Sequence, residues 1–440
     1  MSAPLLRIGI FLLLPIAALA FFLGAYFFFY RGGYEAPPPL DISFEHIVQP
    51  TSSKASFSEV PQIHEGTLLV DGVHRNEFTK EEISPLLAKI ADRGYSIDIV
   101  GETARDGRFI RLRSDNPFDL FAQKLRQADS LAVILPNEPF SSKEADLVER
   151  FLAKGGRLLL IGDPTRDHDI NSLAARFGVR FQPGYLYNTI EYDLNFQNIY
   201  VRDFRPDLLT QGIGQVVFYT AGSVKSSGPG LAYTDGNTRS TVVERVEQFF
   251  PMVKTSDDQV VAIGDMTFMV PPRNAILDND RLISNIADFL TTGQRTFDLG
   301  DFPYFLGDNV EILLGSSTLI GQGTAAKALL TGLHKNSRIV GSEDIAQDTV
   351  YLGLYQDASD VAQYLEVNGI RVGDSLRTPF TPDLDKKGSG LMLFHKGPDR
   401  NVFVILGDTE GSITDMLDQL GSSAFRAGLV SDFVGVYRTP

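Results

Sequence analysis

An uninterrupted apolar run near the start constrains this chain more than any other feature of its sequence. Residues 8–30 (IGIFLLLPIAALAFFLGAYFFFY) are 23 consecutive residues without a charged side chain. In a helix that rises about 1.5 Å per residue, the run would span about 34 Å, enough for a hydrocarbon core of roughly 30 Å. Tyr26 and Tyr30 flank three phenylalanines near one end, as in the aromatic belt of a membrane interface. The run therefore predicts one transmembrane helix.

A cleaved signal peptide is the alternative for this run, because Ala18, Leu19 and Ala20 imitate a small-x-small cleavage site. The apolar part of a signal peptide normally has about 7–15 residues, whereas here the run continues for ten positions beyond Ala20. We therefore expect a retained, single-pass anchor in the cell membrane. Arg7 and Arg31 nearly balance each other, but the long acidic segment that follows favours a cytoplasmic amino terminus and extracytoplasmic soluble domains.

The remaining composition is that of a globular protein with more than one domain. The chain has 440 residues, of which 43% are hydrophobic and 22% are charged, so a disordered or polytopic membrane protein is excluded. Its net charge is −15, and the part after residue 31 holds 38 basic and 55 acidic residues, a net charge of −17. Such an acidic surface repels nucleic acid, so we expect membrane and protein partners instead.

Residues 32–65 predict a linker, because they combine glycines, the prolines 37–39 and a serine-rich stretch without sustained periodicity. From residue 66, buried-strand patterns alternate with helical patterns up to residue 293, which predicts a parallel sheet with helices on both faces. Residues 180–258 are richer in Tyr, Asn, Gly and Thr, and we expect an insertion there. The predicted strands are 67–71, 96–100, 131–136, 157–163 and 259–265, and the predicted helices are 83–94, 144–156, 170–178 and 281–290.

Residues 297–440 predict a second, smaller α/β domain that we cannot assign to a family. Three strand patterns are each followed by a helical pattern, which is the order of βα units. The strands are expected at 310–315, 349–355 and 401–408, and the helices at 324–333, 358–369 and 412–421.

Four segments of the first domain together resemble a known family. They are LLVDGVHRNEFT (68–79), the strand–helix–strand segment 131–163, INSLAARFGVRF (170–181) and the segment 260–290. In this order they resemble the glutamine-amidotransferase-like domain of unknown function in membrane-anchored bacterial proteins, which is related to auxiliary subunits of gliding-motility-type ABC transporters and to intraflagellar-transport domains. The resemblance covers residues 66–293. It implies a flavodoxin-like sheet and a binding or scaffolding role rather than amidotransferase activity.

Cysteine chemistry is excluded, because the chain contains no cysteine. A class I amidotransferase attacks glutamine with a thiolate at a strand-to-helix elbow, which would correspond here to residues 160–164. A serine nucleophile would need a Gly-x-Ser-x-Gly elbow after a strand, and the sequence has none in that context. We assign no catalytic residue, no metal ligand and no cofactor.

The candidate ligand-binding residues are Asp71, His74, Asp163 and Asp265. The three aspartates end predicted parallel strands, and ligands of open α/β sheets bind at that edge. These side chains could cap loops and helices, hold a ligand or divalent metal, or supply a general base, and capping is the interpretation we favour. Residues 167–169 (Asp-His-Asp) add polar groups to the same edge, but alternating loop positions need not point the same way.

Two further motifs favour structural interpretations. Residues 278–280 (Asp-Asn-Asp) resemble the start of a calcium loop but lack its glycine and distal glutamate, so we expect them to cap the helix that follows. Residues 321–326 fit a relaxed Gly-x-Gly-x-x-Ala pattern without a strand directly before it, and we expect a loop and helix start that binds no nucleotide.

Two functions remain open at the level of the sequence. The first is a membrane-anchored, non-enzymatic binding or scaffold protein, an accessory to an ABC-type exporter or an envelope assembly. The second is an envelope hydrolase or metal-dependent enzyme that uses the strand-end carboxylates. The arrangement of Asp71, His74, Asp163 and Asp265 separates them, because a cluster around an open pocket favours the enzyme and dispersed caps favour the scaffold.

Overall fold

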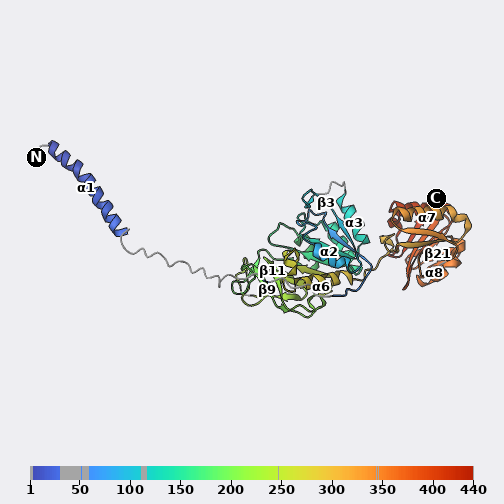
Figure 1. Ribbon diagram of the computed structural model, residues 1–440. Coiled ribbons are helices and arrows are strands. Elements are labelled where there is room, and N and C mark those ends of the chain that lie inside the picture. The colour runs from blue at the N-terminus through green and yellow to red at the C-terminus, as the bar shows by residue number, and fades with distance from the viewer. Residues whose placement is uncertain are drawn as a thin grey trace. The chain divides into compact units, whose positions relative to one another are not determined.

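A computed structural model describes residues 3–29, 51, 59–110, 116–245, 247–342, 344 and 346–439. The chain divides into two units, residues 1–50 and residues 51–440. The first unit contains α1 (Ala3–Phe29), drawn in dark blue in Figure 1. Within it, Phe11–Phe29 is a 19-residue stretch of mean hydropathy 2.3, long and apolar enough to cross a membrane. The predicted apolar helix is thus confirmed. Signal sequences meet the same criterion, and Tyr30, Arg31 and most of the expected linker lie outside the described residues.

An eight-stranded sheet forms the centre of the first α/β domain. In spatial order its strands are β10 (Asp203–Phe204), β13 (Gly230–Tyr233), β15 (Met252–Lys254), β16 (Val260–Ile263), β6 (Arg157–Ile161), β5 (Ser130–Ile134), β1 (Thr67–Asp71) and β2 (Ser96–Val100). The five strands from β16 to β2 are parallel, and the other three extend the sheet in antiparallel fashion. Numbered along the chain, the parallel strands lie in the order 2-1-3-4-5, which is a common order of doubly wound sheets. The predicted parallel-rich α/β fold is confirmed.

Helices cover both faces of this sheet, because alternate residues of its central strands are apolar and point to opposite sides. On β1, Leu68 and Val70 belong to one buried cluster and Leu69 to the other. The first face is covered by α2 (Ser84–Ala91) and α6 (Asn279–Thr291), and the second by α3 (Pro117–Gln127), α4 (Ser142–Ala153) and α5 (Asn171–Ala174). Helix α3 was not expected from the sequence.

The expected insertion at residues 180–258 consists of short antiparallel strands. Three of these strands, β10, β13 and β15, extend the eight-stranded sheet. The others form two-stranded sheets, which pair β7 (Val179–Phe181) with β12 (Val224–Ser226), β8 (Leu186–Tyr187) with β14 (Arg239–Ser240), and β9 (Asn198–Val201) with β11 (Val216–Tyr219). One more two-stranded sheet, β3 (Glu102–Thr103) with β4 (Phe109–Ile110), precedes the insertion in the sequence. The Tyr219 amide of β11 donates to Asp265, which places the β9–β11 pair beside the carboxyl end of β16.

A six-stranded sheet forms the second domain. In spatial order its strands are β18 (Asn336–Val340), β17 (Asn309–Leu314), β19 (Asp348–Leu354), β24 (Asn401–Gly407), β23 (Ser389–Lys396) and β25 (Val434–Arg438). The first four are parallel and lie in the chain order 2-1-3-4, which matches the first domain. One face is covered by α7 (Ile320–Gly332) and α9 (Glu410–Gly421), and the other by α8 (Ala362–Val367). A three-stranded sheet of β20 (Arg371–Val372), β21 (Ser375–Thr378) and β22 (Thr381–Asp385) follows α8.

The glycine motif at residues 321–326 lies entirely within α7, so the expected loop is wrong. A short 3-10 turn at Ser317–Leu319 follows β17, and the helix begins directly after it at Ile320. Gly323 is buried, and a Cβ there would lie 3.0 Å from Leu314 of β17. The glycine thus permits close packing of a helix on a strand, and it needs no nucleotide.

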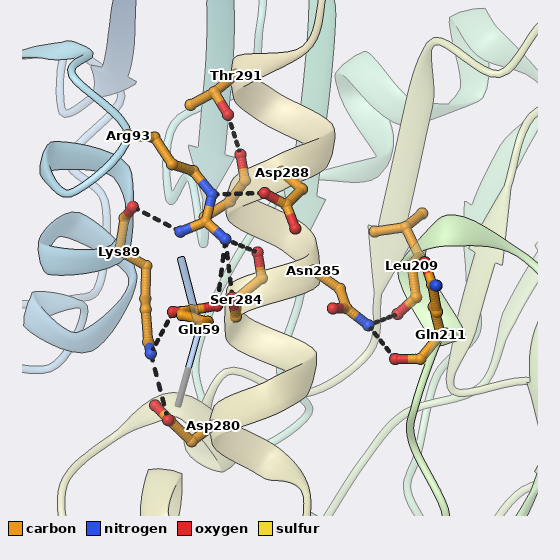
Figure 2. Close-up of polar contacts among 11 residues, drawn as sticks. Glu59, Lys89, Arg93, Leu209, Gln211, Asp280, Ser284, Asn285, Asp288 and Thr291 are labelled. Carbon is orange, nitrogen blue, oxygen red and sulfur yellow. Dashed lines mark hydrogen bonds and ion pairs between the residues drawn. The ribbon is translucent and has the colours of Figure 1, made fainter. Parts of the chain in front are cut away.

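The chain that leads into β1 is attached to the first domain before the expected domain start at residue 66. The amide and hydroxyl of Thr51 donate to Asp193 at 3.1 and 2.6 Å. Further along, Glu59 accepts from Lys89 of α2 at 2.7 Å and from Ser284 of α6. Residues 59–65 therefore pack as a strap on the α2–α6 face, in contrast to the linker expected there (Figure 2).

The strap rests on a buried arginine. Arg93, which is 1% exposed, donates to Asp288 at 2.6 Å, to Ser284 Oγ at 2.8 Å and to the Lys89 carbonyl at 2.9 Å (Figure 2). Glu59 lies 3.5 Å from the same guanidinium. Although burial opposes its ionisation, bonds from Lys89 and Ser284 lower the pKa of Glu59 below its usual value. The strap therefore supplies a carboxylate to a charge network between two helices.

The connector between the two α/β domains is bonded to both. Arg295, which is largely buried, donates to the carbonyls of Leu125, Arg126 and Ala128 at the end of α3. A few residues later, Leu299 and Phe302 belong to the hydrophobic core of the second domain. Because so few residues separate Arg295 from Leu299, the connector between the two domains is short and anchored at both ends.

Candidate functional site

Each strand-end aspartate of the first sheet makes the same local turn. One carboxylate oxygen accepts from the backbone amide two residues later, namely Val73 for Asp71 (3.1 Å), Thr165 for Asp163 (2.9 Å) and Thr267 for Asp265 (2.6 Å). Such Asx turns reverse the chain where a parallel strand leaves the sheet. All three aspartates are fully buried. The sequence therefore places carboxylates at this edge for a local backbone reason before any ligand is considered.

The remaining acceptor positions of Asp71 are filled by two side chains. His74 Nδ1 donates to both carboxylate oxygens at 3.0 Å, and Asn76 Nδ2 donates to Oδ2 at 3.2 Å. The other imidazole nitrogen of His74 lies 3.6 Å from Glu144 Oε1, at the start of α4. The ring stacks on Phe140 with 3.6 Å between centroids. His74 thus joins the end of β1 to the amino end of α4.

The charges of this group stabilise one another. Burial opposes ionisation of His74, but the charge and hydrogen bond of Asp71, followed by Glu144, raise the pKa of His74 to about 10. Burial likewise opposes ionisation of Glu144, but bonds from His74 and Ser141 lower the pKa of Glu144 to about 2. At neutral pH, His74 is therefore an imidazolium between two carboxylates. It has no free nitrogen with which to act as a base or to bind a metal.

Asp163 and Asp265 form a second group, at the ends of the neighbouring strands β6 and β16. Asp163 accepts from the Thr165 hydroxyl at 2.6 Å, and from the Met266 amide and the Thr267 hydroxyl at 3.2 Å each. Asp265 accepts from the Tyr219 amide at 2.7 Å. Burial, and then the charge of Asp163, raise the pKa of Asp265 well above its usual value. The pair holds the loops after two strands together.

A small cavity of about 370 Å³ opens beside this second group. Asp163, Arg166 and His168 are among its lining residues. Within the described residues, His168 Nδ1 is buried without a hydrogen-bond partner. Burial lowers the pKa of His168 below its usual value and outweighs the nearby aspartates. His168 is therefore a neutral imidazole at this edge, unlike His74, and the cavity is the part of the edge that could accept a small ligand.

The predicted site residues therefore divide into two groups. Hydrogen bonds join Asp71 with His74, and Asp163 with the loop of Asp265, but within residues 59–110, 116–245 and 247–342 none joins Asp71 or His74 to Asp163 or Asp265. The described residues contain no set of three or more His, Asp or Glu side chains arranged to hold a metal ion. Asp167 and Asp169 are exposed on either side of His168. The chain has no cysteine, so cysteine-dependent amidotransferase activity is excluded.

Sequence reasoning overlooked the threonines. Thr165 and Thr267 follow Asp163 and Asp265 at the same spacing, and both hydroxyls donate to Asp163. The repeated Asp-x-Thr at two strand ends was a readable signal for this arrangement. Asn76 was also missed, because its partners, Asp71 and the Ile134 carbonyl, are adjacent only in the folded sheet.

The acidic motif at residues 278–280 does not cap its helix with a side chain. Asp278 is the N-cap of α6 but makes no side-chain capping bond, and the expected role is wrong. Its carboxylate instead accepts from the amides of Gly214 and Gln215 at 2.9 and 3.1 Å, while Asn279 bonds the amide of Val217. These side chains hold the insertion against α6.

Comparisons with known proteins find weak similarity to solved structures. No protein-family model and no curated protein matches the sequence. Among solved structures, the chain is similar to the mmIFT52 N-terminal domain at 14% identity and a TM-score of 0.40, over 52% of this chain and 100% of that one. It is also similar to a ThuA-like protein from Parabacteroides merdae at 11% identity and a TM-score of 0.34, over 54% of this chain and 93% of that one. The function must therefore be argued from the residues themselves.

Proposed function

We propose that this chain is a single-pass, membrane-anchored scaffold without enzymatic activity. Helix α1 is the retained anchor, its amino terminus lies in the cytoplasm, and the soluble domains lie outside. The first of these is a flavodoxin-like domain of the amidotransferase-like family, and the second is an additional α/β domain. Together they bind protein partners beside the membrane, as an accessory to an ABC-type exporter or an envelope assembly.

The observation that carries the proposal is that both oxygens of each strand-end carboxyl group are hydrogen-bonded within their own chain. Both oxygens of Asp71, of Asp163 and of Asp265 accept hydrogen bonds, and all three side chains are fully buried. A metal ion or a substrate would have to displace these donors and leave them unpaired, which is costly in a buried site. The carboxylates therefore serve to hold loops, as a rigid binding scaffold requires.

The anchor is supported by the exposure of α1. None of the residues in its apolar 18-residue window is buried. A helix that is apolar on all sides and uncovered is stable in a bilayer, whereas in water it would expose a large apolar surface.

The anchor and its orientation can be tested in sealed membrane vesicles of known sidedness. The full chain should resist carbonate extraction, and an added protease should digest the soluble domains only when their side of the membrane is accessible. A mature protein that begins after residue 20, or soluble domains protected on the cytoplasmic side, would contradict the proposal.

The scaffold role is tested by photo-crosslinking in the natural membrane. A photoreactive residue is introduced at exposed positions of either domain, such as Val242 and Val367, which are 55% and 74% exposed. Discrete adducts with a membrane or envelope protein are expected from at least one domain. The same positions in a chain lacking residues 1–31 are the matched control, and their adducts should be lost. Absence of adducts from a full set of surface positions would argue against a scaffold.

The second candidate remains a hydrolase or metal-dependent enzyme at the carboxyl edge. The specific observation in its favour is the unpaired, neutral His168 beside a cavity next to Asp163. A divalent cation that binds there should stabilise the protein, and this outcome is separated from the scaffold by the Asp163 variants discussed below.

A further inference from the structure

Three arginines gather in a second cavity, where the two domains and their connector meet. The cavity has a volume of about 590 Å³. Arg126 comes from the last turn of α3, Arg150 from the last turn of α4, and Arg426 from the 3-10 turn Ala424–Gly428 before β25. A cation in the last turn of a helix interacts favourably with the helix dipole, so Arg126 and Arg150 each stabilise their own helix. Their meeting with Arg426 is produced by the tertiary structure.

The other charges of the cavity are paired with one another. Lys154 lies 2.8 Å from Asp298 and 2.9 Å from Asp301, and Arg295 lies 3.4 Å from Asp301. These contacts account for two cations and two carboxylates. The three arginines then face a single remaining carboxylate, that of Asp432. The cavity therefore has an excess of two positive charges, in a chain whose net charge is −15.

The three arginines have few contacts of their own. Arg150 Nε donates to the Asp146 carbonyl at 3.2 Å, and the Arg426 guanidinium lies 5.8 Å from the centre of the Phe425 ring. Within the described residues, the half-buried guanidinium of Arg126 has no hydrogen-bond or ion-pair partner. Burial, and then the like charge of Arg426, lower the pKa of Arg126 below its usual value, and they outweigh the opposite charge of Asp301. The like charges of the three arginines therefore repel one another, and an anion between them would reduce this repulsion.

The connector holds this cluster in place. Arg295 donates to the backbone carbonyl of Arg126 at 2.9 Å, and the Thr296 amide donates to the Lys154 carbonyl at 2.7 Å. On the other side, the Leu299 amide donates to the Asp432 carbonyl at 2.8 Å. Backbone bonds thus tie the ends of α3 and α4 to the segment that precedes β25. The backbone that carries the arginines is therefore held in place before a ligand binds, which reduces the entropy lost on binding.

We propose that this cavity binds a phosphorylated small molecule, with the phosphate between Arg126, Arg150 and Arg426. A phosphate monoester carries close to two negative charges, which matches the excess, and guanidinium groups bind phosphate in bidentate fashion. The apolar body of the ligand lies against Phe297 and Phe433, the second of which is 39% exposed. The volume is in the usual range for small-molecule sites.

Calorimetric titration of the full chain in neutral detergent tests the proposal, with phenyl phosphate as the probe. Saturable binding is expected, and Arg126→Gln and Arg426→Gln should each weaken it by about tenfold or more, because each removes charge-assisted bonds. Arg426→Lys should weaken it by a smaller factor, because it keeps the charge and loses the bidentate geometry. Arg377→Gln is the matched control, since Arg377 is an exposed arginine of the second domain paired with Asp383.

Two further probes define the ligand class. Glycerol 3-phosphate, which represents a lipid headgroup, should bind more weakly than phenyl phosphate, because it lacks the apolar body. Benzoate should bind more weakly still, because it carries one charge. No saturable binding of phenyl phosphate, equal binding to Arg426→Gln and wild type, or equal affinity for all three probes would overturn the proposal.

Discussion

A carboxylate is the side chain that the turns at the strand ends require. At Asp163, one oxygen faces the amide and hydroxyl of Thr165, and the other faces the amide of Met266 and the hydroxyl of Thr267. An asparagine would place an amide donor against donors on one of these two sides. Acceptors on both sides are available only from an ionised aspartate.

Replacement of Asp163 by asparagine should therefore destabilise the protein by about 1–3 kcal/mol, because one buried donor group loses its acceptor. Thermal or urea unfolding measures the change. Asp167→Asn, an exposed aspartate in the same loop, is the control and should be close to neutral. We expect no metal-dependent shift of the melting temperature in wild type. Stabilisation by calcium or magnesium that disappears in Asp163→Asn would instead support the enzyme.

The imidazolium of His74 predicts a dependence of stability on pH. Its folded pKa of about 10 lies above the unfolded value of about 6.5, so the folded state holds one extra proton between these values. Its contribution is complete below about pH 6.5 and is lost as the pH rises through 10, with a slope of up to about 1.4 kcal/mol per pH unit.

Urea unfolding between pH 6 and pH 10 tests this, as the difference between wild type and His74→Gln. The difference in unfolding free energy should shrink as the pH rises. His395→Gln is the control, because burial and Arg400 lower the pKa of His395, and its removal should leave the slope above pH 7 unchanged. A constant difference between wild type and His74→Gln across this range would show that the ring is neutral in the folded protein.

At the scale of elements, the strap of residues 59–65 belongs to the first domain although it precedes β1. Glu59 completes a network in which Lys89 also contacts Asp280 at 3.3 Å and Arg93 contacts Asp288 (Figure 2). Without the strap, the buried guanidinium of Arg93 loses one of its two carboxylates and gains contact with solvent. The domain therefore begins no later than Glu59.

A chain that begins at Thr51 should be more stable than one that begins at Gly66, by about 1–3 kcal/mol, because charged hydrogen bonds of the strap are retained. Glu59→Gln in the longer chain should reproduce part of the loss, and Glu65→Gln, an exposed position of the same strap, should not. Urea unfolding of the four proteins gives the comparison. Equal unfolding free energies of the two truncated chains would mean that residues 51–65 do not stabilise the domain.

For the whole molecule, the apolar helix and the two α/β domains belong to different compact units. The unit boundary lies between Pro50 and Thr51. Both sheets carry their own two-sided cores, and neither core includes α1. We therefore expect residues 51–440 to fold without the anchor.

Deletion of residues 1–31 should release a soluble, folded protein whose melting temperature equals that of the full chain in mild detergent. Solubility without detergent and circular dichroism measure the outcome. Recovery of the truncated protein only as aggregate, under conditions in which the full chain is well behaved, would contradict this division of the chain.

Features that depend on a local pattern of residues can be read from the sequence alone. The length and apolarity of residues 8–30 specified the first helix, and the buried runs at 67–71, 157–163 and 259–265 specified parallel strands ended by aspartates. These features follow from residue spacing and from the number of residues between breaks, which are readable along the chain.

Which side chains contact one another depends on the fold of the whole chain. His74 lies beside Glu144 at the start of α4, and Glu59 lies beside Arg93. The like charges of Arg126 and of Arg426 in the other domain also act on one another. Helix α3 and the inner strand β23 also escaped the sequence analysis. Contacts between residues that are far apart in sequence depend on strand order and helix packing, and the local pattern that predicts each element contains no information about its neighbours in space.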